Sequence, residues 1–291
     1  MPAIRFSPRG YVGSIVRDTR ASLGRVARDR AALMTIIALL LPWFALIFLR
    51  ANTDWLWQLA GLAGIVFAFW WMSRSGSAPL PAIKRPRSEL FFALALGVFW
   101  ILWRVGICGD LFFFLPADFK CFQSFEFELV PKVVALVLVP IAVLFAAGYR
   151  SRAQGIDLNL RAWGIALPVV LGVAAYAVYL HYSDLPKLAQ NIVEYFFAAG
   201  LPEEVLFRAL LLTRLEAWWR NSAWALFGAS VIFGLTHLPI DYLFFTSRDW
   251  RETWITVLTF QMGFGAAFAF AYQRTRNIWL IALLHALVDA M

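Results

Sequence analysis

Nine long apolar segments, separated by short polar ones, limit what this chain can fold into more than any other feature of the sequence. A helix needs about 20 mostly apolar residues to cross the hydrocarbon core of a bilayer. Only 15% of the chain is charged, whereas a soluble domain is about 25% charged. The apolar segments lie at residues 31–49, 55–73, 89–108, 129–149, 162–180, 188–215, 222–240, 253–272 and 277–291.

These segments predict an all-α, polytopic membrane helix bundle, because a helix satisfies its own backbone hydrogen bonds in lipid. We expect eight or nine transmembrane helices. The count stays open because Arg104 interrupts the segment at 89–108 and the segment at 277–291 is short. We therefore expect an integral membrane protein, whose partner is the lipid bilayer. The membrane expected is a bacterial cell membrane.

The positive charge follows the loops between the apolar segments. The chain carries a net charge of +8, from 26 Lys and Arg against 18 Asp and Glu. With nine crossings, 18 of the 26 basic residues fall on one side, seven on the other, with Lys132 among the seven, and Arg208 lies inside a segment. Because cytoplasmic loops are enriched in Lys and Arg, the N-terminus is expected in the cytoplasm. Positive charge spread over short loops, with no motif that enters a groove, argues against a nucleic-acid partner.

Cys108 and Cys121 lie in or beside the loop at 104–130, on the side with less positive charge. Two cysteines on an oxidising face can form a disulfide. The sequence gives no distance between them, so a disulfide and two free thiols are both left open.

A few ionisable residues lie within the apolar segments. Charge near the centre of a membrane helix costs at least about 2.5–3.5 kcal/mol, so such residues usually face an interior cavity and are functional. We expect these side chains to form an intramembrane polar cavity. They are Glu194, Glu203, Glu204, Arg208, His237, His285 and Asp289.

The sixth segment contains Gly200 and Pro202, which are expected to break or kink its helix. Glu204 and Arg208 are four residues apart and can pair on one helical face. Glu203 points about 100° away from Glu204, so we expect it to lack that partner and to be free for proton chemistry. Glu194, nearer the outer end, is interpreted as an interfacial residue.

The helices that carry these groups bring them to similar depths. At about 1.5 Å per residue, Glu204, His237 and His285 lie roughly 14–22 Å from the cytoplasmic ends of their helices. Asp289 follows His285 by one helical turn on the same face. Carboxylates and imidazoles that converge in this way can activate water, either directly or on a metal. An ion-pair network that only joins helices is the structural alternative, which we favour for Glu204 with Arg208.

The pattern resembles the CPBP family of intramembrane proteases, which contains type II CAAX prenyl endopeptidases and bacterial abortive-infection proteins. The residues that carry this resemblance are Glu203-Glu204 with Arg208, Phe233 with His237, and His285 with Asp289. They cover about residues 185–291. We accordingly divide the chain into a basic tail at 1–30, helices of unassigned role at 31–184, and a protease core at 185–291.

The resemblance implies a role for each residue. Glu203 is implied as the general base that activates the attacking water, assisted by His237. His285 and Asp289 are implied to steady the oxyanion or complete the water site, and Glu204 with Arg208 to position the others. Because an ionised Asp donates no hydrogen bond, we expect Asp289 to orient His285 or to stay protonated, with His285 stabilising the oxyanion.

The sequence leaves the metal question open. Glu203, His237 and His285 form a two-His, one-carboxylate set that is typical of catalytic zinc, but no His-Glu-x-x-His helix occurs. The cofactor is therefore either none or zinc, and we favour the metal-free glutamate mechanism over a metalloendopeptidase.

The expected function is an intramembrane endopeptidase that hydrolyses a peptide bond of a membrane-associated protein or peptide, for which a prenylated CAAX tail is one candidate. Two other classes compete with it. The first is a non-catalytic membrane scaffold or immunity factor that binds a peptide in the same cavity. The second is a proton-coupled transporter, which the absence of a repeated half in the sequence argues against.

Overall fold

The computed structural model describes residues 29–30, 68, 71–72, 78–108, 125–149 and 160–291, and within them the ordered elements are helices, with no strand. The first helices are α4 (Pro86–Cys108), a rod made of α5 (Phe125–Val133), η2 (Val134–Leu138) and α6 (Val139–Ala146), and α7 (Leu160–Leu180). The elements labelled η are π-helical turns within longer helices. The predicted all-α fold is therefore confirmed for the described part of the chain.

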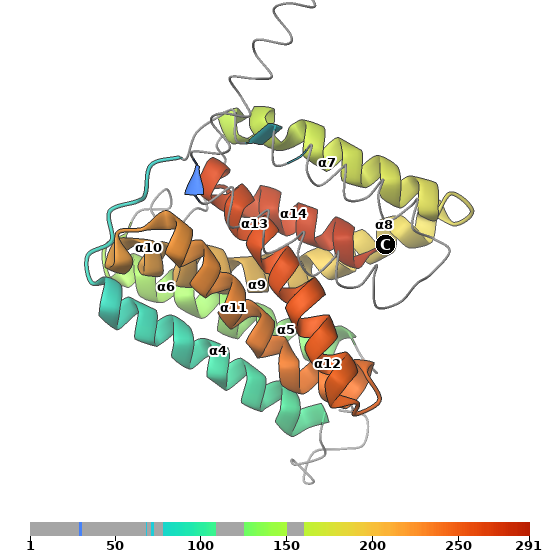
Figure 1. Cartoon of the computed structure of the whole chain (residues 1–291), viewed down its shortest axis with the longest axis horizontal. Coiled ribbons are helices and arrows are strands. Elements are labelled where there is room, and N and C mark those ends of the chain that lie inside the picture. Colours follow the sequence, from blue (N-terminus) through green and yellow to red (C-terminus); the bar gives the residue numbers. More distant parts are fainter. Residues whose placement is uncertain (1–28, 31–67, 69–70, 73–77, 109–124, 150–159) are drawn as a thin grey trace, which may run out of the picture.

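The remaining helices, which Figure 1 shows, carry all of the predicted site residues. The longest rod consists of α8 (Leu185–Tyr195), η4 (Phe196–Gly200), α9 (Leu201–Glu204), η5 (Val205–Leu212) and α10 (Thr213–Trp219). It is followed by α11 (Ser222–Ile240) with η6 (Asp241–Phe245), by α12 (Trp250–Thr256) with η7 (Val257–Gln261) and α13 (Met262–Thr275), and by α14 (Ile278–Asp289).

These helices match seven of the nine predicted apolar segments, and the segments at 31–49 and 55–73 fall almost wholly outside the described residues. Within the described part, five helices are long and apolar enough to cross a membrane, at 86–106, 129–146, 162–180, 222–245 and 250–275, and α14 is a shorter apolar helix. Residues 1–28 of the basic tail and the side chains of Cys108 and Cys121 also lie outside the described part of the chain.

Short polar residues determine where several helices begin. The side chains of Asn221, Asp249 and Asn277 accept hydrogen bonds from backbone N–H groups in the first turns of α11, α12 and α14. These N–H groups have no partner inside the helix, so such caps stabilise helix starts. At the opposite ends, α10 and α13 stop at Arg220 and Arg276, which adopt left-handed backbone conformations with φ of 53° and 46°.

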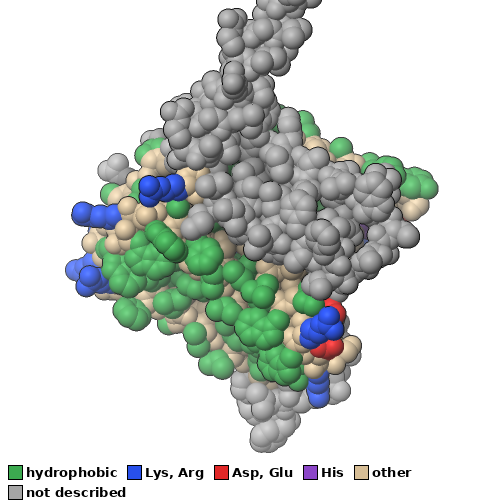
Figure 2. Space-filling model, in the orientation of Figure 1, with side chains coloured by type: hydrophobic (Ala, Val, Ile, Leu, Met, Phe, Trp, Pro, Cys, Tyr) green, Lys and Arg blue, Asp and Glu red, His purple; other side chains and the backbone are tan. Residues whose placement is uncertain are grey.

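The start of α4, the helix α10 and the end of α13 are joined by ion pairs at one end of the bundle. Arg214 pairs with Glu89 at 2.9 Å, and Arg276 pairs with Glu216 at 2.7 Å. The Tyr149 hydroxyl also donates to Glu89, and burial together with this hydrogen bond raises the pKa of Tyr149. In Figure 2, some Lys and Arg side chains lie at the left end, where Figure 1 places α10 and the start of α4, and others lie at the lower right beside acidic side chains.

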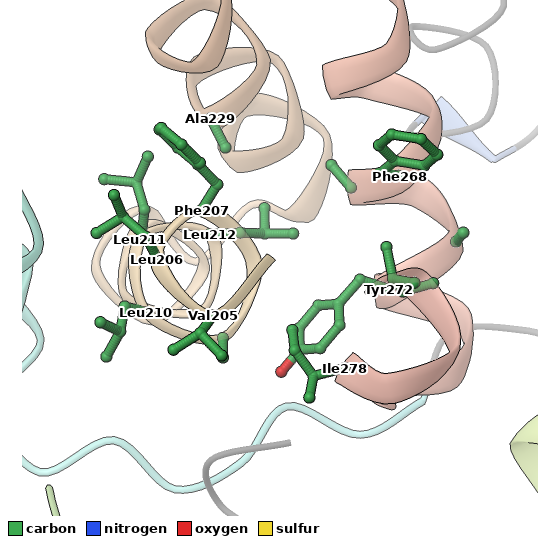
Figure 3. Packing of buried hydrophobic residues seen from close by; sticks show 14 of the residues in the cluster. Val205, Leu206, Phe207, Leu210, Leu211, Leu212, Ala229, Phe268, Tyr272 and Ile278 are labelled. Carbon is green, nitrogen blue, oxygen red and sulfur yellow. The ribbon is translucent and has the colours of Figure 1, made fainter. Parts of the chain in front are cut away.

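The interior is built around η5 and α14, whereas the outer helices expose apolar side chains. Figure 3 shows apolar residues of η5 surrounding the helix and packing toward α11 and α13. By contrast, Phe91 and Leu102 of α4 are 72% and 63% exposed. Hydrophobic side chains cover much of the face in Figure 2 where α4 and α11 lie. Exposed apolar surface of this extent suits contact with lipid.

Candidate active site

The predicted site residues from three separate helical rods lie together in the interior. Glu203 and Glu204 come from α9, His237 from α11, and His285 from α14. The side chains of Glu203 and His285 are 8% and 7% exposed, and that of His237 is 17% exposed. The structure therefore brings together residues that are up to 82 positions apart, as the estimate of common depth predicted.

The rod that carries the two glutamates is continuous through Gly200 and Pro202, so of the predicted break or kink the break does not occur. Gly200 and Leu201 keep right-handed helical dihedrals. The Leu201 N–H donates to the carbonyl of Phe196, five residues back, so the turn before Pro202 is π-helical. A wider turn of this kind accommodates the proline ring and its missing N–H, and π turns occur often at functional sites.

Gly200 has a packing role instead. A Cβ added at Gly200 would lie 2.5 Å from the backbone oxygen of Ala282 in α14. Only glycine permits the two backbones to approach this closely. Glu203 and Glu204 follow Gly200 by about one turn, and His285 follows Ala282 by about one turn. The close approach therefore positions both glutamates beside the imidazole.

Glu203 has one oxygen bound and the other directed at two imidazoles. Its Oε1 accepts a hydrogen bond from Lys132 Nζ at 2.7 Å. Its Oε2 lies 3.7 Å from His237 Nε2 and 3.9 Å from His285 Nε2. Arg208 pairs with Glu204 and not with Glu203, as expected, but Glu203 is not unpaired, because Lys132 from α5 binds its Oε1.

Each imidazole is held through its Nδ1 atom. His237 Nδ1 lies 2.9 Å from the carbonyl oxygen of Phe233, and His285 Nδ1 lies 2.8 Å from Glu204 Oε1. A carbonyl oxygen only accepts hydrogen bonds, so the proton of His237 is on Nδ1. The Nε2 atoms of both rings are left to face Glu203.

Glu204 joins two of the predicted residues. One oxygen accepts from His285, and the other lies 3.1 Å from Arg208 Nε, which confirms the predicted pairing at four residues' spacing. The structural role that we favoured for Glu204 and Arg208 is too narrow, because Glu204 also orients His285. Asp289 lies 3.5 Å from His285 Nε2, the atom that faces Glu203. Glu204 therefore contacts His285 at Nδ1, and Asp289 lies on the Nε2 side of the same ring.

Arg208 is enclosed by polar and aromatic groups. Its guanidinium donates to the backbone oxygen of Gly265 and lies 4.5 Å from the ring centroid of Phe233 and 5.5 Å from that of Phe268. The Phe268 ring also stacks on His285, with centroids 4.9 Å apart. Phe233 and Phe268 therefore fix the ion pair and the imidazole at the same time.

Lys132 and Asp241 lie near the predicted site residues but were not among them. Lys132 was assigned to a loop although it lies inside the apolar segment at 129–149, and that position is the sequence signal that could have identified it. The structure shows that its side chain is buried. Asp241 is 2% exposed and follows His237 by one turn. Asp241 follows directly after the apolar segment at 222–240, so it was not counted among the ionisable residues within the segments.

The residues do not fit a catalytic zinc site. Among the described residues, no three His, Cys, Asp or Glu side chains are arranged so that they could hold a metal ion. In addition, the Lys132 ammonium binds Glu203 directly, and a second cation on the same carboxylate would be repelled. We therefore assign no role to a metal.

Comparison with known proteins supports the resemblance for one part of the chain. Residues 185–291 match the family described as Rce1-like, type II CAAX prenyl endopeptidase Rce1-like. At the family level this is a match to intramembrane proteases of the CAAX type, as the motifs predicted. Neither the curated proteins nor the solved structures yield a match. Lys132 lies outside the matched residues.

Proposed function

We propose that this chain is an intramembrane endopeptidase in which Glu203 and His237 activate the water that attacks a peptide bond. One observation carries the proposal: Glu203 Oε2 faces the Nε2 atoms of His237 and His285 at 3.7 and 3.9 Å in a buried site. Polar groups at these separations are too far apart for direct hydrogen bonds and suit a bridging water. The family match over residues 185–291 supports the same chemistry.

In the proposed reaction, Glu203 Oε2 takes one proton from the water as its oxygen bonds to the scissile carbonyl carbon. His237 Nε2 accepts the second hydrogen of the water as a hydrogen bond and orients it. The negative charge that develops on the carbonyl oxygen is stabilised by His285, whose ring lies between the carboxylates of Glu204 and Asp289. Glu203 then passes its proton to the leaving amine nitrogen as the carbon–nitrogen bond breaks.

The proposed substrate is a membrane-associated protein with a prenylated CAAX tail. The supporting feature is an apolar cleft between α4, η5 and α11. Two of its lining residues, Phe207 and Thr236, directly precede Arg208 and His237 in the sequence. An isoprenoid chain that entered between these helices would meet apolar side chains close to the catalytic cluster. We further propose that residues 185–291 form the protease core and that the preceding helices complete its wall.

The experiment compares wild type with Glu203→Gln, which keeps the size of the side chain and removes the base. Each protein is purified in detergent, reconstituted in liposomes, and mixed with a peptide that ends in a farnesylated CAAX sequence, and the released tripeptide is measured by mass spectrometry. We expect cleavage by wild type and a loss of at least about 10³-fold in Glu203→Gln, the scale of removing a catalytic group.

Glu194→Gln is the matched control. Glu194 lies in the same rod, where it accepts a hydrogen bond from Gln190 on the exposed surface, and its substitution is expected to leave cleavage unchanged. Cleavage by Glu203→Gln at the wild-type rate would remove the proposed mechanism. A cellular effect of the protein that persists in this variant would favour the non-catalytic scaffold.

A further inference from the structure

Lys132 is a buried cation in contact with Glu203, and the proposed reaction assigns it no function. It lies on α5, its side chain is 2% exposed, and its Nζ is 5.3 Å from the ring centroid of Trp100. A lysine in this position is costly, because an ammonium must leave water to reach it. The free-energy cost of burying this ammonium is expected to be offset by a contribution to the chemistry of the site or to the stability of the fold.

Stability is a weak reason for a buried ion pair. Replacing such a pair with well-packed apolar residues is often neutral or stabilising, because desolvation of the two charges offsets their attraction. The contact between Lys132 and Glu203 also joins two rods that already pack through apolar side chains. Leu136 and Val137 of η2, one to two turns after Lys132, are buried in the same core as Leu201 and Val205.

The contact has a specific geometric effect on the carboxylate. A glutamate can rotate about its last bond and exchange its two oxygens. In this site, Lys132 is the only described residue within hydrogen-bond distance of Glu203 through a side chain, at 2.7 Å. Binding Oε1 therefore fixes the plane of the carboxylate and leaves Oε2 directed at His237 and His285.

We propose that Lys132 is a positioning residue of the peptidase reaction, which fixes the carboxylate of Glu203 so that Oε2 faces the water site. The inference rests on the proposed function and extends the working site beyond the matched residues 185–291. It also gives the α5 segment a definite contribution to catalysis. Lys132 acts through Glu203 and forms no bond to the substrate.

The test measures kcat and KM for Lys132→Met and Lys132→Arg with the farnesylated CAAX peptide in liposomes. In Lys132→Met we expect kcat to fall by about 10²-fold, the scale of a loss of alignment, with KM within about threefold of wild type. Lys132→Arg keeps a cationic donor, and its kcat is expected to be at least about tenfold higher than that of Lys132→Met.

Glu89→Gln is the control for the loss of an ion pair elsewhere in the bundle, one that is partly buried. It breaks the Arg214–Glu89 pair at the polar end of the bundle, and we expect its kcat to stay near the wild-type value. Each variant must elute as a single species with wild-type helical circular dichroism. If Lys132→Met fails this folding check, Lys132→Gln is used in its place, because glutamine is neutral and its side chain is one atom shorter than lysine. For Lys132→Gln we expect kcat to fall at least about tenfold.

The outcomes separate this inference from the proposed function. A folded Lys132→Met with wild-type kcat, beside an inactive Glu203→Gln, overturns the role of Lys132 and leaves the peptidase intact. An equal loss in Glu89→Gln, or no recovery in Lys132→Arg, reduces Lys132 to a structural residue and also overturns the inference. A wild-type protein that does not cleave the peptide overturns the proposed function and this inference together.

Discussion

Substituting Gly200 by alanine tests whether the close contact between α9 and α14 aligns the site. The added Cβ would lie 2.5 Å from the oxygen of Ala282, whereas real Cβ atoms essentially never come nearer than 3.0 Å. The two helices must therefore separate locally by about 0.5 Å or more. Glu203 and Glu204 would move away from His285 by a similar amount, because they lie on the same rigid turn.

The expected magnitude follows from two opposing effects. Alanine favours a helix over glycine by about 0.5–1 kcal/mol, whereas overpacking a buried contact costs about 1–3 kcal/mol. At the middle of both ranges overpacking is the larger effect, and we expect a net destabilisation of about 1 kcal/mol. A displacement of 1 Å can reduce a rate about 10²-fold, so half of that displacement is expected to lower kcat about tenfold.

The assay combines thermal unfolding in detergent with cleavage of the farnesylated CAAX peptide. Gly172→Ala on α7 is the matched control, because no atom lies within 4 Å of the Cβ that it adds. We expect this control to keep the wild-type rate and to be equally or more stable. If Gly200→Ala is as stable and as active as Gly172→Ala, the close approach does not hold the site and our reasoning is refuted.

Two further predictions concern Glu204 and zinc. Glu204→Gln removes the counter-charge of the buried Arg208 and is expected to lower the free energy of unfolding by about 3–5 kcal/mol, measured by chemical denaturation in detergent; Glu204→Gln with Arg208→Met should lose less. A Glu204→Gln variant as stable as wild type would contradict this. For zinc, elemental analysis of the purified protein is expected to find less than stoichiometric metal, and a chelator should leave peptide cleavage unchanged. Activity that is lost on chelation and restored by zinc would contradict the metal-free mechanism.

The helical fold could be predicted because its signal is local. Each apolar segment is read from its own residues, and lipid leaves few alternatives to a helix for such a segment. The helices at 86–108, 160–180 and 278–289 therefore begin and end within three residues of the predicted segments. The turn at Gly200 could not be read in the same way, because whether a proline breaks a helix or widens one turn depends on the neighbour against which it packs.

For the candidate site, too, the local features could be predicted from the sequence and the contacts between distant helices could not. The positions of Glu203, His237 and His285 follow from the sequence, since ionisable groups inside apolar helices are few and stand out. Their partners do not, because the Lys132–Glu203 contact spans 71 residues and the Glu204–His285 contact spans 81. The sequence by itself determined that this chain forms membrane helices with buried acids and histidines. Only the packing of distant helices decided which oxygen of Glu203 is free, which carboxylate orients His285, and that a lysine completes the cluster.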